Sequence, residues 1–202
     1  MIDTNKIIMK LASENLIANE ENKKYTDFTG SINYNRTNAK VENATFTLKD
    51  NQIIWEKGTW HEGTWENGIW NGGIWKSGTW LNGTWEKGVV EYCIWKNGTW
   101  KLGTWKIGNW YNGTWENGVW EYGFWKDGKW EYGIWKKGAW NDGLWSGGIH
   151  QNGEWYGGKF QKLDKKSVWE DGIWFKGIWS GGDWVKGKNN MKEDKNISPD
   201  KW

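Results

Sequence analysis

The sequence predicts an all-β protein, an antiparallel meander of very short strands that coils into a rod with a tryptophan core. From Trp55 to Phe160 every fifth position is Trp, apart from Val90, His150 and Phe160 itself, and a glycine almost always stands two places earlier. A five-residue period is not helical, and glycine at this density would cost a helix about 1 kcal/mol per residue. The repeat is G-h-W-x-x, with h mostly Thr, Ile or Val, residues that favour strands.

The glycine of many repeats follows a residue that favours tight turns. The pairs read Asn-Gly, Asp-Gly or Gly-Gly, which two-residue hairpin turns prefer because both central residues need positive φ. Pairing across Asn67-Gly68 would place Trp65 opposite Trp70, with every Trp on one face of the sheet. The pairs lie at 67–68, 82–83, 97–98, 112–113 and 117–118 (Asn-Gly), 127–128 and 142–143 (Asp-Gly), and 72–73 and 147–148 (Gly-Gly).

A right-handed four-sided β-solenoid is the alternative. Such a coil also runs on five-residue units, with a small residue two places before a large inward-pointing one, as Gly58 stands before Trp60. Two observations favour the meander. Four indoles per coil would overfill its cross-section, which is costly, and the internal duplications step in tens, residues 83–97 matching 113–127.

Tryptophan is interpreted as the core of the repeat. Ordering five residues costs about 7 kcal/mol of conformational entropy, and a buried Trp contributes roughly 4–6 kcal/mol. An exposed array of indoles would be an aggregating patch, so we expect the ladder to be covered. The predicted core residues include Trp60, Trp65, Trp70, Trp75, Trp80, Trp100, Trp115 and Trp130.

The pattern divides the chain into five segments. Residues 1–50 are a terminal cap or a docking segment, two readings that stay open, with a short N-terminal helix over 4–17 and three strands over 26–55. Residues 51–160 form the repeat array, and 161–168 interrupt it. Residues 169–187 form a second block, and 188–202 are a charged tail predicted to be disordered.

Composition excludes several classes of function. The net charge is +2, so no nucleic-acid partner is implied. Cys93 is the single cysteine, and neither His61 nor His150 has a ligand partner at useful spacing. We therefore predict no enzyme activity, no catalytic residues, no cofactor and no metal. No secretion signal and no transmembrane segment are expected.

The run "GTWENGIW" (63–70) resembles half of a MORN repeat, whose units are antiparallel hairpins. The chain keeps G-x-W-x-x-G but lacks the longer period and the regular leading Tyr of that family. The tandem W-x-x-G pentapeptides also resemble repeats in structural proteins of bacteriophages. The first likeness implies a meander; the second implies a component of a virion or tail.

We expect a non-enzymatic structural and interaction protein, part of an oligomer or larger assembly such as a phage particle, with contacts to host surface glycans. The alternative is a MORN-like cytoplasmic module that binds a membrane surface or a scaffold partner. The expected location is accordingly the virion or the cytoplasm. Exposed aromatic residues can anchor proteins or sugars, and the candidate contact residues are Tyr92, Tyr122, Tyr132 and Trp202.

Overall fold

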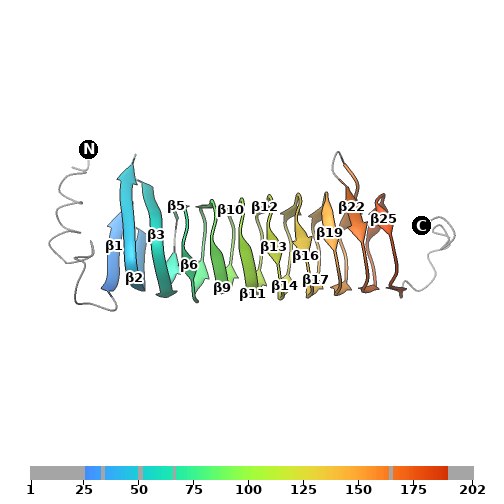
Figure 1. Cartoon of the computed structure of the whole chain (residues 1–202), viewed down its shortest axis with the longest axis horizontal. Coiled ribbons are helices and arrows are strands. Elements are labelled where there is room, and N and C mark those ends of the chain that lie inside the picture. Colours follow the sequence, from blue (N-terminus) through green and yellow to red (C-terminus); the bar gives the residue numbers. More distant parts are fainter. Residues whose placement is uncertain (1–25, 33–34, 50–51, 66, 164–165, 191–202) are drawn as a thin grey trace.

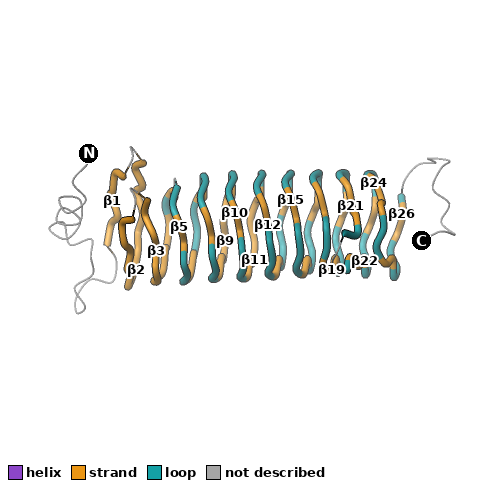
Figure 2. The backbone as a smooth tube through the Cα atoms, turned by 90° about the horizontal axis from the view of Figure 1, so that it is seen from above, coloured by secondary structure: helices purple, strands orange, loops and turns teal. Residues whose placement is uncertain are grey.

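The chain forms an elongated parallel β-solenoid of about 9 turns (Figure 1). The structure, a computed structural model, describes residues 26–32, 35–49, 52–65, 67–163 and 166–190. Successive turns stack along the axis of a rod, with short strands joined by corners (Figure 2). The predicted helix over 4–17 lies outside the described residues.

Each turn has three sides and is built from three pentapeptides. Strand partners are fifteen residues apart and parallel, as Trp100 is with Trp85 and Trp115. The next two pentapeptides form the other two sides in the same way, because Trp105 pairs with Trp120 and Trp110 with Trp125. We name the sides first, second and third in chain order, and each corner after the side that precedes it.

The first side contains β3 (Gln52–Glu62), β5 (Ile69–Trp70), β8 (Thr84–Trp85), β10 (Thr99–Trp100), β12 (Thr114–Trp115), β15 (Lys129–Trp130), β18 (Leu144–Trp145), β21 (Lys159–Gln161) and β24 (Ile178–Ser180). The second side contains β3 again, β6 (Ile74–Trp75), β9 (Val89–Trp95), β11 (Thr104–Trp110), β13 (Val119–Trp120), β16 (Ile134–Trp135), β19 (Gly148–His150), β22 (Ser167–Trp169) and β25 (Asp183–Trp184). The third side contains β4 (Thr64–Trp65), β7 (Thr79–Trp80), β9 and β11 again, β14 (Phe124–Trp125), β17 (Ala139–Trp140), β20 (Glu154–Trp155), β23 (Ile173–Trp174) and β26 (Lys188–Asn189).

The antiparallel meander predicted from the Asn-Gly pairs is wrong. At Asn117-Gly118 the glycine has φ of 129°, but positive φ is absent from Asn117, and a type I′ hairpin turn would need it at both residues. The Asn117 side chain instead accepts a hydrogen bond from the Gly118 N–H at 2.8 Å, which shapes a corner and not a reversal. The chain therefore continues around the coil, and Trp65 pairs with Trp80 rather than with Trp70.

The four-sided alternative is correct in being a solenoid and wrong in its number of sides. The expected crowding of four indoles is avoided because each coil holds three. Neighbouring indoles within a coil meet edge to face, with Trp100 and Trp105 centroids 5.9 Å apart at 75°. Indoles in successive coils stack, with Trp100 and Trp115 4.8 Å apart at 6°. Both geometries are favourable for aromatic pairs.

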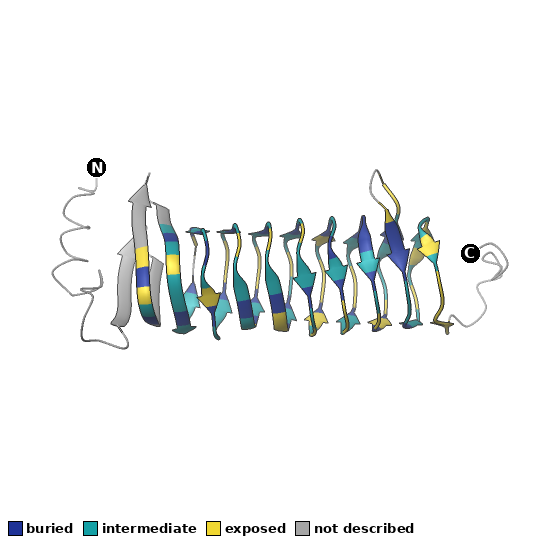
Figure 3. Cartoon of the chain, in the orientation of Figure 1, coloured by how far each residue is buried: buried dark blue, intermediate teal, exposed yellow. Residues whose placement is uncertain are grey.

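Three columns of stacked aromatic rings therefore fill the rod, and Val90 interrupts the one on the second side. Figure 3 shows that buried positions recur from turn to turn along the ribbon. The Trp residues named as core from the sequence all lie in them, each no more than 2% exposed. The indole N–H groups of Trp100, Trp130 and Trp135 donate to corner carbonyls of the next coil at 3.1–3.2 Å. Most other described indole N–H groups are buried without such a partner. The stacking must offset that cost.

Two departures from the repeat, at positions 90 and 93, depend on each other because their side chains share one space. Val90 takes a Trp position, Cys93 takes a glycine position, and both are 1% exposed. In regular coils the Trp ring edge lies against the glycine three residues later: a Cβ on Gly103 would be 3.1 Å from Trp100 Cζ2. A side chain at position 93 therefore occupies space that an indole at position 90 would need.

The interruption at 161–168 lengthens one turn without ending the stack. Trp155 stacks on Trp174 at 4.9 Å, rather than on Glu170, which is fifteen residues later. Phe160 stacks on Trp179 at 4.5 Å. The described part of the second repeat block thus continues the same three columns.

At the N-terminal end the first coil is covered by antiparallel strands. Strand β1 (Thr26–Ile32) pairs with β2 (Asn35–Lys49), and β2 pairs with β3, as the alternation in this segment predicts. Val41 and Ala44 of β2 are buried in the same cluster as Trp55 and Trp60. Strand β2 therefore covers the edge and the core of the first coil, as a solenoid cap does.

Candidate interaction surfaces

The outward side chains recur every fifteen residues and form longitudinal columns. On the second side the position after Trp alternates in charge from coil to coil. Lys76 lies 3.1 Å from Glu91, Glu91 lies 3.4 Å from Lys106, and Lys136 lies 3.1 Å from Glu121. The hydrogen bond from Lys76 holds the pKa of Glu91 below its ordinary value. Because charges of opposite sign neighbour each other, this side offers no strong field to a charged partner.

The second corner carries an exposed apolar ridge. Tyr92, Ile107 and Tyr122 occupy equivalent places in three successive coils and are 41%, 43% and 50% exposed. Phe124, 39% exposed, follows Tyr122 at the start of the third side. We call these four residues the ridge. Clustered exposed aromatic residues are typical of contact surfaces.

The candidate contact residues are only partly brought together. Tyr92 and Tyr122 share the ridge, while Tyr132 precedes the Gly133 of the first corner and lies apart from them. Trp202 is outside the described residues. Ile107, which lies between the two ridge tyrosines, was not identified from the sequence, because only the fifteen-residue turn places it there.

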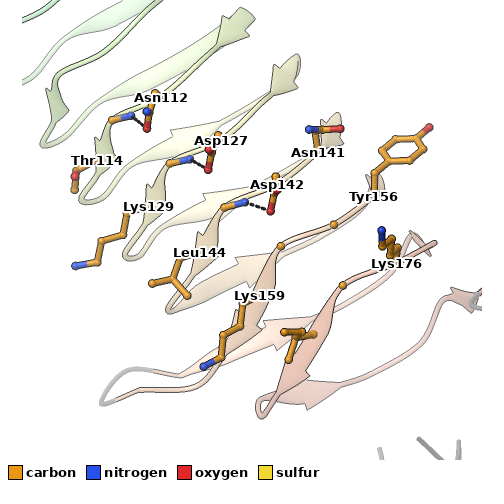
Figure 4. A pocket seen from close by; sticks show the side chains of 17 residues that line it. Asn112, Thr114, Asp127, Lys129, Asn141, Asp142, Leu144, Tyr156, Lys159 and Lys176 are labelled. Carbon is orange, nitrogen blue, oxygen red and sulfur yellow. Dashed lines mark hydrogen bonds between the residues drawn. The ribbon is translucent and has the colours of Figure 1, made fainter. Parts of the chain in front are cut away.

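The third corner carries a column of asparagine and aspartate. All its members are exposed. Gly N–H groups donate to the side chains of Asn112, Asp127 and Asp142 at 2.6–2.7 Å (Figure 4). The Asn97 amide also contacts Asn82 Oδ1 at 3.5 Å, across one coil. The column consists of Asn67, Asn82, Asn97, Asn112, Asp127 and Asp142.

A groove of about 960 Å³ runs along this corner over the C-terminal half of the rod. Its floor is made by the corner turns from Asn112-Gly113 to Lys176-Gly177. Figure 4 shows Thr114, Lys129, Leu144 and Lys159 along one wall and Asn141, Tyr156 and Lys176 along the other. None of these residues was identified as a site from the sequence, although Asn-Gly at 67, 82, 97 and 112 already recurs every fifteen residues.

Side chains that could act as nucleophiles, acids, bases or metal ligands do not gather into a reactive site in the described part of the chain. Burial raises the pKa of the Cys93 thiol, which makes it a poor nucleophile. Burial also lowers the pKa of His150 to about 3. His61 Nε2 lies 3.1 Å from Glu42 Oε2 and joins β3 to β2. Among the described residues no group of His, Cys, Asp and Glu could hold a metal ion.

Comparison with family models, with curated proteins and with solved structures gave no match. In the described residues no helix combines the length and the apolar character that crossing a bilayer requires.

Proposed function

We propose that this protein is a non-enzymatic structural rod, a stiff spacer within a larger assembly that presents interaction surfaces along its length. The single buried core of three columns, aromatic apart from Val90 within the array, runs through about 9 turns and carries the proposal. Each coil is held to the next by stacked rings and by parallel backbone hydrogen bonds, such as Glu116 N–H to Trp100 O at 2.7 Å. Bending the rod would open these contacts on one side, so we expect it to resist bending.

The assembly we propose is a bacteriophage particle, such as a virion or tail, and the rod contacts glycans on the host surface. The likeness of the pentapeptides to repeats in phage structural proteins supports the particle. The ridge supports a protein contact, because Tyr92, Ile107 and Tyr122 present apolar surface along one corner. In this proposal the ridge attaches the rod to a protein neighbour.

The test is recovery of the tagged protein from its native lysate, followed by mass spectrometry. We expect capsid or tail proteins at a fixed stoichiometry. A triple variant of the ridge, Tyr92→Ser with Ile107→Ser and Tyr122→Ser, should lose these partners while keeping the near-ultraviolet dichroism of the stacked indoles. The matched control is Tyr156→Ser, which changes an exposed tyrosine away from the ridge.

Recovery of signalling proteins alone, together with binding to anionic vesicles, would contradict the particle proposal and support a MORN-like module. If the triple variant retains all partners, the proposal that the rod belongs to the particle stands, and the proposal that the ridge attaches it is contradicted.

A further inference from the structure

The groove on the third corner has the features of a site for a long, uncharged ligand. It is open and continuous, and each coil contributes residues at equivalent positions: a corner turn on the floor and a side chain at the start of the next strand. Coils repeat at the spacing of adjacent strands, about 4.8 Å. A polymer laid along the axis would therefore meet a new corner turn at regular intervals close to the length of one sugar ring.

We propose that this groove binds an extended chain of a neutral polysaccharide, aligned with the rod axis. The inference rests on the glycan contact proposed above and names its site. The floor supplies polar groups suited to hydroxyls. The Asn112, Asp127 and Asp142 side chains each accept one hydrogen bond from the following Gly N–H, which orients them. The second carboxylate oxygen or the amide group of each remains to bind a ligand.

One wall supplies an oriented aromatic ring. Tyr156 is 41% exposed and lines the groove. Its hydroxyl donates to Glu154 Oε2 at 2.6 Å, and its ring stacks on Phe175 with centroids 4.9 Å apart at 3°. Both contacts hold the ring in place before a ligand arrives, which lowers the entropy cost of binding. A fixed aromatic face packs well against the C–H groups of a pyranose ring.

The balance of charge favours an uncharged ligand. Asp127 and Asp142 lie at the corner turns of the groove, and Lys129, Lys159 and Lys176 also line it. Lys129 is itself paired with Glu131 at 2.6 Å. A nucleic acid or another polyanion would meet the two carboxylates on the floor, and a basic polymer would meet the lysines. A hydroxyl-rich neutral chain meets hydrogen-bonding groups of both kinds without repulsion.

The experiment is affinity electrophoresis of the full chain in native gels that contain one polysaccharide each. The neutral probes are hydroxyethylcellulose, glucomannan, xylan and dextran, and hyaluronan is the anionic probe. We expect retardation by at least one neutral chain with little dependence on salt. Tyr156→Ala and Asn112→Ala should each weaken this binding about tenfold, the size expected for one well-placed contact.

Each groove variant has a matched control elsewhere on the rod. Tyr122→Ala removes an exposed tyrosine from the ridge. Asn117→Ala removes an asparagine that caps its glycine at 2.8 Å, as Asn112 does at 2.7 Å, but on the first corner. Both controls should bind like the unaltered protein.

Absence of retardation by all neutral probes would overturn the proposal, and so would equal binding by groove and control variants. Binding to hyaluronan alone, abolished by salt, would also overturn it and indicate a site for polyanions. These outcomes leave the structural rod untouched, because the rod is tested by the partners recovered from the lysate and by its shape in solution.

Discussion

At most corners of the coil a glycine adopts a backbone conformation that side chains oppose. Gly73 has φ of 118°, and a Cβ there would lie 2.3 Å from the carbonyl oxygen of Gly58 in the preceding coil. Its neighbour Gly72 has no positive φ, and a Cβ there would lie no closer than 3.7 Å to any neighbouring atom. The two adjacent glycines therefore have different physical roles.

We expect Gly73→Ala to lower the free energy of unfolding by roughly 2–4 kcal/mol, because the residue must hold a strained φ and the coils must move apart. Gly72→Ala is the matched control. It should be neutral or stabilise by about 0.4–1 kcal/mol, because alanine restricts the unfolded chain. Urea denaturation followed by tryptophan fluorescence measures both, and equal effects would contradict the corner geometry.

His150 replaces an indole in the second-side column and is fully buried. Its ring lies among Trp135, Trp145, Trp155 and Trp169, with the Trp169 centroid 3.9 Å away. Burial lowers its pKa from 6.5 to about 3. Between these two values the unfolded chain binds a proton that the folded chain does not, so stability falls as the pH falls.

We therefore expect the rod to lose stability below about pH 6.5, by on the order of 1 kcal/mol per pH unit until about pH 3. His150→Phe should remove this dependence, because phenylalanine fills the same column without titrating. Urea denaturation from pH 4 to pH 8 gives the unfolding free energy of the two proteins. The difference between them separates the contribution of His150 to the pH dependence from that of the carboxylates. Parallel pH profiles would show that His150 is solvated or charged in the fold.

At the scale of the element, β9 and β11, like β3 at the start of the array, continue through a corner. Strand β9 contains both Val90 and Cys93, and Cys93 pairs with Gly108 of β11. Positive φ is absent from Cys93, in contrast to the glycines at the equivalent positions. The smaller Val90 and the added Cys93 side chain thus compensate for each other within one strand.

A double-mutant cycle tests this compensation. Val90→Trp alone should destabilise the rod, because the indole edge would meet the side chain at position 93. Cys93→Gly alone should also destabilise, because it leaves space beside Val90 unfilled. The double variant restores the regular repeat, and we expect a favourable coupling on the order of 1–3 kcal/mol, measured by chemical denaturation. If the effects of the two single substitutions on the unfolding free energy simply add, the side chains at positions 90 and 93 do not compete for the same space.

At the scale of the whole molecule, contacts run between successive coils, so the rod behaves as a stack of fifteen-residue units. The aromatic columns, the Lys and Glu ladder and the Asn and Asp column all share this register. The register tests the three-sided coil directly, because a meander would be built from ten-residue strand pairs.

Removing residues 116–130 should shorten the rod by one coil, about 4.8 Å, and preserve its fold. Removing residues 116–125 keeps Trp stacked on Trp but rotates the outer columns out of alignment, so this variant should be less stable. Small-angle X-ray scattering gives the length, and thermal denaturation gives the order of stability. Greater stability of the ten-residue deletion would favour strand pairs as the unit.

The sequence indicates much of this molecule because its signals are local. Strand-forming h residues, a Trp in each repeat and the alternation in 44–50 predict an all-β fold with three initial strands and indoles inside. Tyr92 and Tyr122 of the ridge were predicted as contact residues, but the groove and the ridge as surfaces were not, because they also need residues such as Ile107 and Tyr156 that meet their neighbours only across coils. The recurrence of Asn-Gly every fifteen residues was the available signal.

The sequence by itself determined that tryptophan lies inside and that glycine lies at nearly every bend of the repeat array. Whether each bend reverses the chain or only turns it was decided by the tertiary structure, because an Asn-Gly pair is compatible with both. In a meander every indole would keep one face open to solvent until another layer covered it. In the three-sided coil most rings are covered above, below and at their edges by other rings of the same chain, and this more complete burial selects the solenoid.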